Sequence, residues 1–223
     1  MKTEASVAGV KLLGPDEPEF NALLQTLWGR EPDDVLLPAL PYSVIARNHA
    51  SRTVAFLGVR FDMRSSAGNV YSVVHYADSL RYPENADLKP EGMRFVCAEP
   101  LYTGLVLRRE SRVDPRGPMN LGNLRKALTI SASIDCVAFD NGHFTGVDSL
   151  AAFDRLARER RAEENLITVL GGSASPEQLL ATAMNEPGLR VLARRWHDGL
   201  AAGGPAELQS LADRHRSRIS LWR

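Results

Sequence analysis

Ser149 and His143 lie close together in the sequence, and with a nearby aspartate they have the residue types of a catalytic triad. Ser149 would be the nucleophile and His143 the base, and Asp140 or Asp148 would orient that base. However, no Gly-x-Ser-x-Gly motif surrounds the serine, and side chains around a hairpin turn diverge. Because Asp and Ser favour turns and helix N-termini, we interpret Asp148 as a helix N-cap and predict no catalytic residue.

The histidines and cysteines lack the spacing of a metal site. The five histidines are scattered one per predicted element, and Cys97 and Cys136 do not form a Cys-x-x-Cys pair. The nearest local groups are His75-Tyr-Ala-Asp78 and His197-Asp198, which are typical of surface histidines beside solvated acids. The sequence therefore predicts no metal.

Phosphate-binding and nucleic-acid-binding signals are also missing. Gly171-Gly-Ser-Ala174 lacks the lysine of a P-loop, and no Gly-x-Gly-x-x-Gly follows a predicted strand. The basic run from Arg155 to Arg161 is followed by Glu163-Glu164, which favours ion pairs along a solvated helix face. Since 27 Lys and Arg balance 27 Asp and Glu, we predict no cofactor and no nucleic-acid partner.

One long segment is the candidate for binding a protein partner. Residues 110–122 show no periodicity and lie in a predicted loop, 99–125, whose length indicates a functional or disordered segment. This loop is modestly basic and also carries apolar side chains. Its candidate binding residues are Arg112, Arg116, Met119 and Leu121.

The middle of the chain is predicted to consist of strands. Short runs rich in Val, Ile, Phe and Tyr are separated by turn residues, which is typical of an antiparallel sandwich. Asn141-Gly142 predicts a hairpin that returns Phe144-Thr145 alongside Val137 to Phe139. The other predicted strands are Tyr42 to Arg47, Thr53 to Met63, Val70 to Tyr76, Met93 to Ala98, and one or two within Leu124 to Phe139.

Helices are predicted on both sides of these strands. Asp16 as N-cap and Glu19 in the capping-box position predict a short helix that ends at Gly29. After Asp148 the apolar spacing predicts four helices: Ser149 to Leu170, Ser175 to about Asn185, one from Leu189 that Gly203-Gly204 ends, and one from Pro205. Because such short helices are unstable alone, they cover a sheet face or form a small bundle.

The segment Ile45 to Asp62, followed by Gly68-Asn-Val-Tyr71, resembles bacterial immunoglobulin-like sandwich domains over residues 42–146. The segment Val137 to Asp148 is similar to one in uncharacterised bacterial proteins of this shape, and that resemblance implies no activity. No Trp lies between Cys97 and Cys136, unlike in antibody domains. We therefore predict an α+β protein with an N-terminal extension (1–41) bearing a short helix, an antiparallel immunoglobulin-like β-sandwich (42–146) and an α-helical C-terminal segment (147–223).

The N-terminus favours a soluble, cytoplasmic protein. Glu4 interrupts any apolar run before Gly14-Pro15, so the sequence predicts no secretory signal. No apolar run approaches the roughly 20 residues that span a bilayer. In an oxidising compartment Cys97 and Cys136 could form an inter-sheet disulfide, but in the cytosol they would be buried thiols, which we favour.

The sequence alone favours a binding role over catalysis. Sandwiches of the resembled kind mostly bind or scaffold, so we expect a non-enzymatic binding or structural module that engages a protein partner through the 99–125 loop. The alternative is a hydrolase or carbohydrate-active protein whose site lies between sandwich and helices and draws on Asp135 or Glu99 with His143. Self-association through exposed strand edges and apolar helix faces is a third hypothesis.

Overall fold

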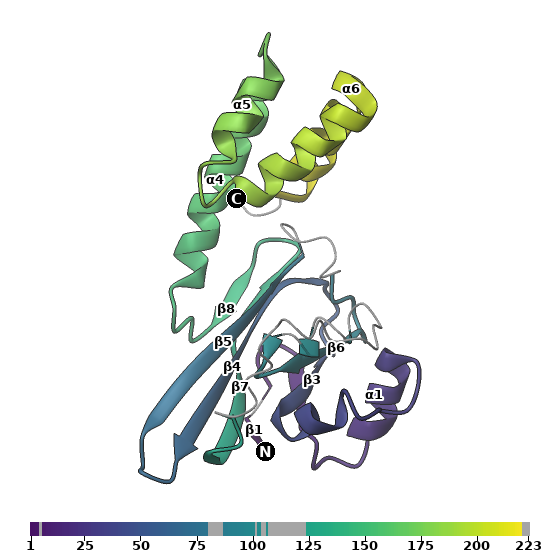
Figure 1. The fold of residues 1–223 in the computed structure, drawn as a ribbon, viewed down its shortest axis with the longest axis vertical. Coiled ribbons are helices and arrows are strands. Elements are labelled where there is room, and N and C mark those ends of the chain that lie inside the picture. The colour runs from purple at the N-terminus through teal and green to yellow at the C-terminus, as the bar shows by residue number, and fades with distance from the viewer. Residues whose placement is uncertain (5, 80–86, 101, 104–105, 107–123, 220–223) are drawn as a thin grey trace. The chain divides into compact units, whose positions relative to one another are not determined.

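The computed structural model describes the chain except for residues 5, 80–86, 101, 104–105, 107–123 and 220–223. The chain divides into two compact units (Figure 1). The first comprises residues 1–139 and 144–147, and the second residues 140–143 and 148–223. The first unit contains the sheets and the second contains the long helices.

The larger sheet has five strands in the order β1-β7-β4-β5, and β8 pairs with part of β7. The strands are β1 (Lys2–Thr3), β4 (Val54–Ser65), β5 (Val70–Asp78), β7 (Ala127–Phe139) and β8 (Phe144–Gly146). β1 runs parallel to β7, whereas the other pairs are antiparallel. The purely antiparallel sheet that we predicted is therefore wrong, because a two-residue strand near the N-terminus is too short to produce a recognisable sequence pattern.

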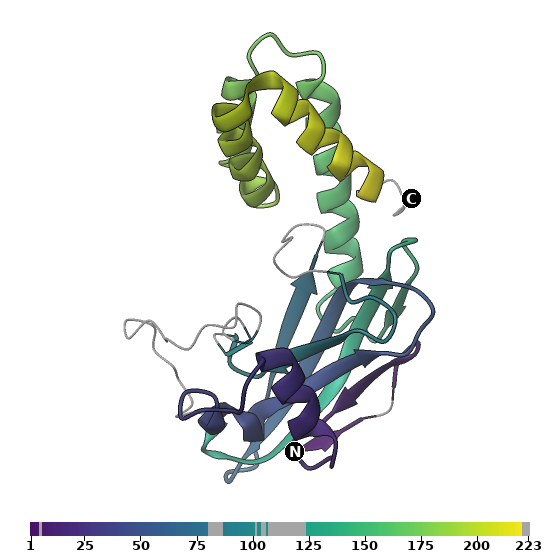
Figure 2. The ribbon, with the colours of Figure 1, turned by 90° about the vertical axis from the view of Figure 1, so that its right-hand side faces the viewer.

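The smaller sheet is antiparallel and has the order β2-β3-β6, where β2 is Val10–Leu13, β3 is Ser43–Asn48 and β6 is Met93–Cys97. Both sheets contribute side chains to one hydrophobic core. Helix α1 (Phe20–Trp28) contacts β3 and β6 (Figure 2). It buries Phe20, Leu24 and Trp28 in that core. A short 3-10 helix, η1 (Leu37–Tyr42), leads into β3.

The short helix predicted within residues 1–41 is confirmed, but its predicted cap is wrong. α1 ends at Gly29, whose φ of 80° is the left-handed conformation typical of a helix stop. The carboxylate of Asp16 instead binds the N-terminal amine of Met1 at 2.7 Å, and Glu19 makes no side-chain cap. A turn in which the N–H of Glu17 bonds to the carbonyl of Gly14 delays the helix until Phe20.

The predicted hairpin after β7 is confirmed. Val137 pairs with Thr145 and Ala138 with Phe144, and Gly142 has a φ of 80°. The side chain of Asn141 accepts a hydrogen bond from the backbone N–H of His143 at 3.2 Å.

The second unit consists of α4 (Ala152–Leu170), α5 (Pro176–Ala183) and α6 (Arg190–Ile219) around a core of its own. α6 is interrupted at Gly204, whose φ of 69° breaks the helix where Gly203-Gly204 predicted it. α4 begins at Ala152, three residues later than predicted. Within the parts of the chain that the structure describes, no helix combines the length and the apolar character needed to cross a bilayer.

Candidate functional site

β5 is an edge strand of the larger sheet. It pairs with β4 over its whole length, from Val70 opposite Arg64 to Asp78 opposite Phe56. Among the residues that the structure describes, no strand pairs with the other edge of β5. The outward backbone N–H and C=O groups of such an edge can receive a further strand.

The composition of β5 does not protect this edge. Natural edge strands are commonly blunted by Lys, Pro, bulges or very short length, and β5 has nine residues with no Lys, Arg or Pro. Val70 is 57% exposed and Tyr71 37%, whereas Asp78 at the other end is buried. On the opposite side of the sheet, the strands beside β7 have only two and three residues. Among the described strands, β5 is therefore the longest at an edge of the larger sheet.

Aromatic contacts hold β5 in place. The ring of Tyr76 stacks on that of Phe56 at 5.3 Å between centroids, and the ring of His75 meets that of Phe61 edge-on at 5.8 Å. The Nε2 atom of His75 lies 2.9 Å from the carbonyl oxygen of Ala98. Burial lowers the pKa of His75, which outweighs the opposing effect of that hydrogen bond and favours the neutral ring at neutral pH.

A polar network links β5 to β4 beside this edge. The Nε atom of Arg60 donates to both carboxylate oxygens of Asp62, at 2.9 and 3.0 Å, and its Nη2 lies 3.1 Å from the hydroxyl oxygen of Ser72. That hydroxyl donates to Asp62. A hollow of about 170 Å³ adjoins the network and is lined by Glu4, Arg60, Asp62, Ser133, Ile134, Asp135 and Val147. It is smaller than the pockets that hold drug-sized ligands.

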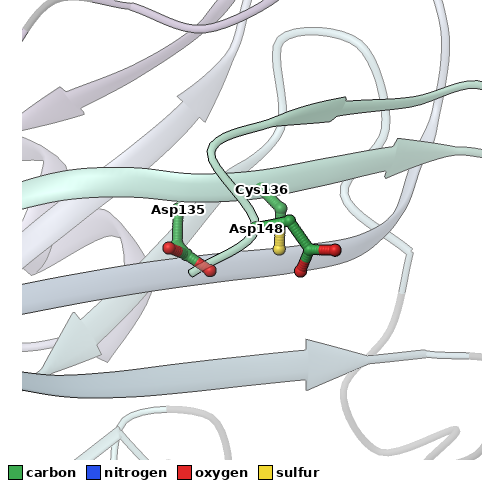
Figure 3. A group of neighbouring side chains, drawn as sticks. All are labelled: Asp135, Cys136 and Asp148. Carbon is green, nitrogen blue, oxygen red and sulfur yellow. The ribbon is translucent and has the colours of Figure 1, made fainter. Parts of the chain in front are cut away.

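Three potential ligand atoms gather near the start of the β7–β8 hairpin. One atom each from Asp135, Cys136 and Asp148 lies within 4.8 Å of the others (Figure 3). The carboxylate of Asp148 accepts hydrogen bonds from the N–H groups of Ala152 at 2.5 Å and Phe153 at 3.0 Å. The N-cap position itself is occupied by Ala151, so the predicted N-cap at Asp148 is wrong in position, although its carboxylate binds the first N–H groups of α4 from three residues earlier. Because these bonds account for the position of Asp148, we assign no metal to the group.

The residues of the hydrolase alternative are not all brought to the polar hollow. Asp135 is buried and lines it. Its position follows from a register shift between β4 and β7, where Gly58 pairs with Cys136 and Val59 with Ile134. Neither Glu99 nor His143 lines the hollow.

The loop residues predicted to bind a partner, Arg112, Arg116, Met119 and Leu121, lie outside the described residues. Some described residues of the 99–125 segment are anchored in the core. Tyr102, Val106 and Leu124 are buried within the cluster that both sheets share.

The two cysteines are thiols, and both are buried. Burial raises the pKa of Cys97 to about 11. Cys136 lies against Gly58, where an added Cβ would meet its sulfur at 2.7 Å. Neither environment resembles the electropositive, accessible surroundings of a reactive cysteine.

The helical unit contains a buried charged cluster that the sequence did not predict. Arg160 and Glu163 were expected on a solvated face, but both are buried together with His215. The Oε2 atom of Glu163 lies 2.5 Å from Nη1 of Arg160 and 3.1 Å from Nε2 of His215. Trp196 meets the ring of His215 edge-on at 5.7 Å. His215 on an otherwise apolar helix stripe was the available signal, since a buried histidine needs a polar partner.

Burial alone would raise the pKa of Glu163. The hydrogen bond from His215 and the positive charge of Arg160 outweigh burial, so the pKa of Glu163 is lowered overall. The cluster lies within the core of the helical unit and is structural in character.

Comparison with protein-family models, curated proteins and solved structures found no match for this chain.

Proposed function

We propose that the protein is a non-enzymatic binding or structural module that binds an extended protein segment along β5. The observation that carries this proposal is the nine-residue edge strand without Lys, Arg or Pro. An added strand would bond to the outward backbone groups of β5 and continue the sheet. For the fold we propose an immunoglobulin-like sandwich, which is supported by the two sheets that share one core.

Side chains of β5 would give this binding its selectivity. Ser72, Val74 and Tyr76 alternate with residues that pack on the core. Ser72 and Val74 lie beside the polar network of Arg60, and Tyr76 stacks on Phe56. A bound segment would therefore present alternate side chains to this row. We expect it to be extended, free of proline in its centre, and apolar at every second position.

The 99–125 loop is a second proposed contact for a protein partner. Its buried residues Tyr102 and Leu124 would fix its ends while its candidate residues, Arg112, Arg116, Met119 and Leu121, contact the partner. The hydrolase alternative has less support, because the hollow lined by Asp135 contains neither Glu99 nor His143.

A display selection tests the proposal. Random nine-residue peptides displayed on phage are selected against the full chain, and we expect enrichment of alternating apolar sequences. Val74→Lys should weaken their binding at least about tenfold, because a charge on a sheet edge opposes strand pairing. Val191→Lys is the matched control, since it places lysine at an exposed valine on α6. Enriched peptides that bind both variants equally would refute β5 as the site.

A further inference from the structure

β5 also has the features of a strand that pairs with a second copy of itself. We propose that two copies of the chain associate by antiparallel pairing of β5 with β5, centred on Val74. This inference rests on the proposed function, because it names the strand that β5 receives. The pairing extends from Tyr71 to Ala77 and stops there because Asp78 is buried (6% exposed).

The register centred on Val74 matches large side chains with small ones. In it Tyr71 lies opposite Ala77 of the second copy, and Tyr76 lies opposite Ser72. The Cβ atoms of directly opposed residues are about 5 Å apart, so each tyrosine ring has room over its small neighbour. Val74 lies opposite its own counterpart, where two β-branched side chains suit a pleated sheet.

The neighbouring two-fold registers are less favourable. A register centred on Val73 places Tyr71 opposite His75 and Tyr76 opposite Val70, so both tyrosines face bulky side chains. One centred on His75 opposes two histidines and requires the buried edge at Asp78. In an antiparallel pair, the side chains of opposed residues lie on the same face of the sheet. A two-fold axis normal to the sheet must therefore pass beside a residue opposed to its own counterpart, and neighbouring registers differ by two residues.

Charge also favours self-pairing of this segment. Residues 71–77 contain no Asp, Glu, Lys or Arg, so the pairing buries no fixed charge and opposes no like charges. In the register centred on Val74, His75, the one basic residue in the segment, lies opposite Val73 of the second copy. A two-fold pair is closed, and among the described strands the short β1 and β8 lie at the far sides of the joined sheet.

Site-directed cross-linking tests the register. In the proposed pair, Val74→Cys places two thiols across the axis within reach of a short bismaleimide. Val70→Cys is the control, because it lies on the same face and Val70 is 57% exposed, but its counterpart is eight residues away along the strand, or about 27 Å. Cys97 and Cys136 are buried and should not react. We expect a cross-linked dimer for Val74→Cys alone; equal cross-linking of both variants would overturn the register.

Sedimentation of the full chain tests the association itself. The wild type should pass from the 24.5 kDa monomer to a dimer as concentration rises. Val74→Lys and Val74→Glu should each remain monomeric, with circular dichroism spectra like that of the wild type, and an equimolar mixture should dimerise again. A wild type that stays monomeric at every concentration would overturn self-pairing. If that monomeric chain still binds the selected peptides at β5, the proposed function stands without it.

Discussion

The buried Glu163 carboxylate is the residue whose loss should cost the helical unit most. It is fully buried, and its partners Arg160 and His215 are nearly so. Because removing one partner leaves buried charge uncompensated, Glu163→Gln should lower the free energy of unfolding at neutral pH by about 3 kcal/mol. Urea unfolding followed by circular dichroism measures this. Glu207→Gln is the matched control: its pair with Arg214 is exposed and should contribute less than about 1 kcal/mol.

The same residue predicts a pH dependence. The pKa of Glu163 is lower in the folded chain than the ordinary value of a glutamate side chain. Its ionisation therefore stabilises the fold above the unfolded-state pKa, and this contribution is lost as pH falls through the folded-state pKa. We expect wild-type stability to decline below about pH 4.3, with a smaller decline for Glu163→Gln. Parallel curves for the two proteins would contradict this account.

Cys97 should be inert in the native protein. Burial raises its pKa to about 11, so almost no thiolate is present at pH 8. Iodoacetamide at this pH should modify neither cysteine until denaturant is added, after which mass spectrometry should show two modified thiols. Rapid modification of the native chain would show that the core around Cys97 opens readily.

Among the elements, the longer strands and the helix stops could be predicted from sequence. Their signals are local. Runs of β-branched and aromatic residues predict the strands β3 to β6, and glycines predict the ends of α1 and α4. β1 and β2 could not be predicted, since two and four residues are too few for a pattern. The predicted cap at Asp16 failed because a competing tertiary contact with Met1 uses its carboxylate.

The contact between β4 and β7 predicts the effect of one glycine substitution. A Cβ at Gly58 would lie 2.7 Å from the sulfur of Cys136 and 3.0 Å from the ring of Tyr76. Gly58→Ala should therefore destabilise the protein by about 1 to 3 kcal/mol through overpacking. In urea unfolding, Gly172→Ala should be nearly neutral, because a Cβ there meets nothing within 4 Å. Equal stabilities for the two variants would contradict the close packing at β4.

At the scale of the whole molecule, sequence could identify β5 as a strand but not as an edge. Strand order depends on which distant segments pair, and β4 is bordered by β7, which is about 50 residues further along the chain than β5. Because the positive and negative charges of the chain balance, net charge likewise did not indicate the chemical class of a partner. The candidate site therefore follows from topology, whereas its chemistry, the lack of charge over residues 71–77, was visible in the sequence.

Amide hydrogen exchange along β5, measured by NMR with and without a selected peptide, tests strand addition most directly. β5 pairs with β4 in antiparallel fashion, so along β5 the N–H groups that bond to β4 alternate with N–H groups that point away from it. Strand addition predicts that binding slows exchange at every second residue between Tyr71 and Ala77, with little change at the residues between them. Binding that leaves exchange along β5 unchanged, or slows it without alternation, would contradict the account.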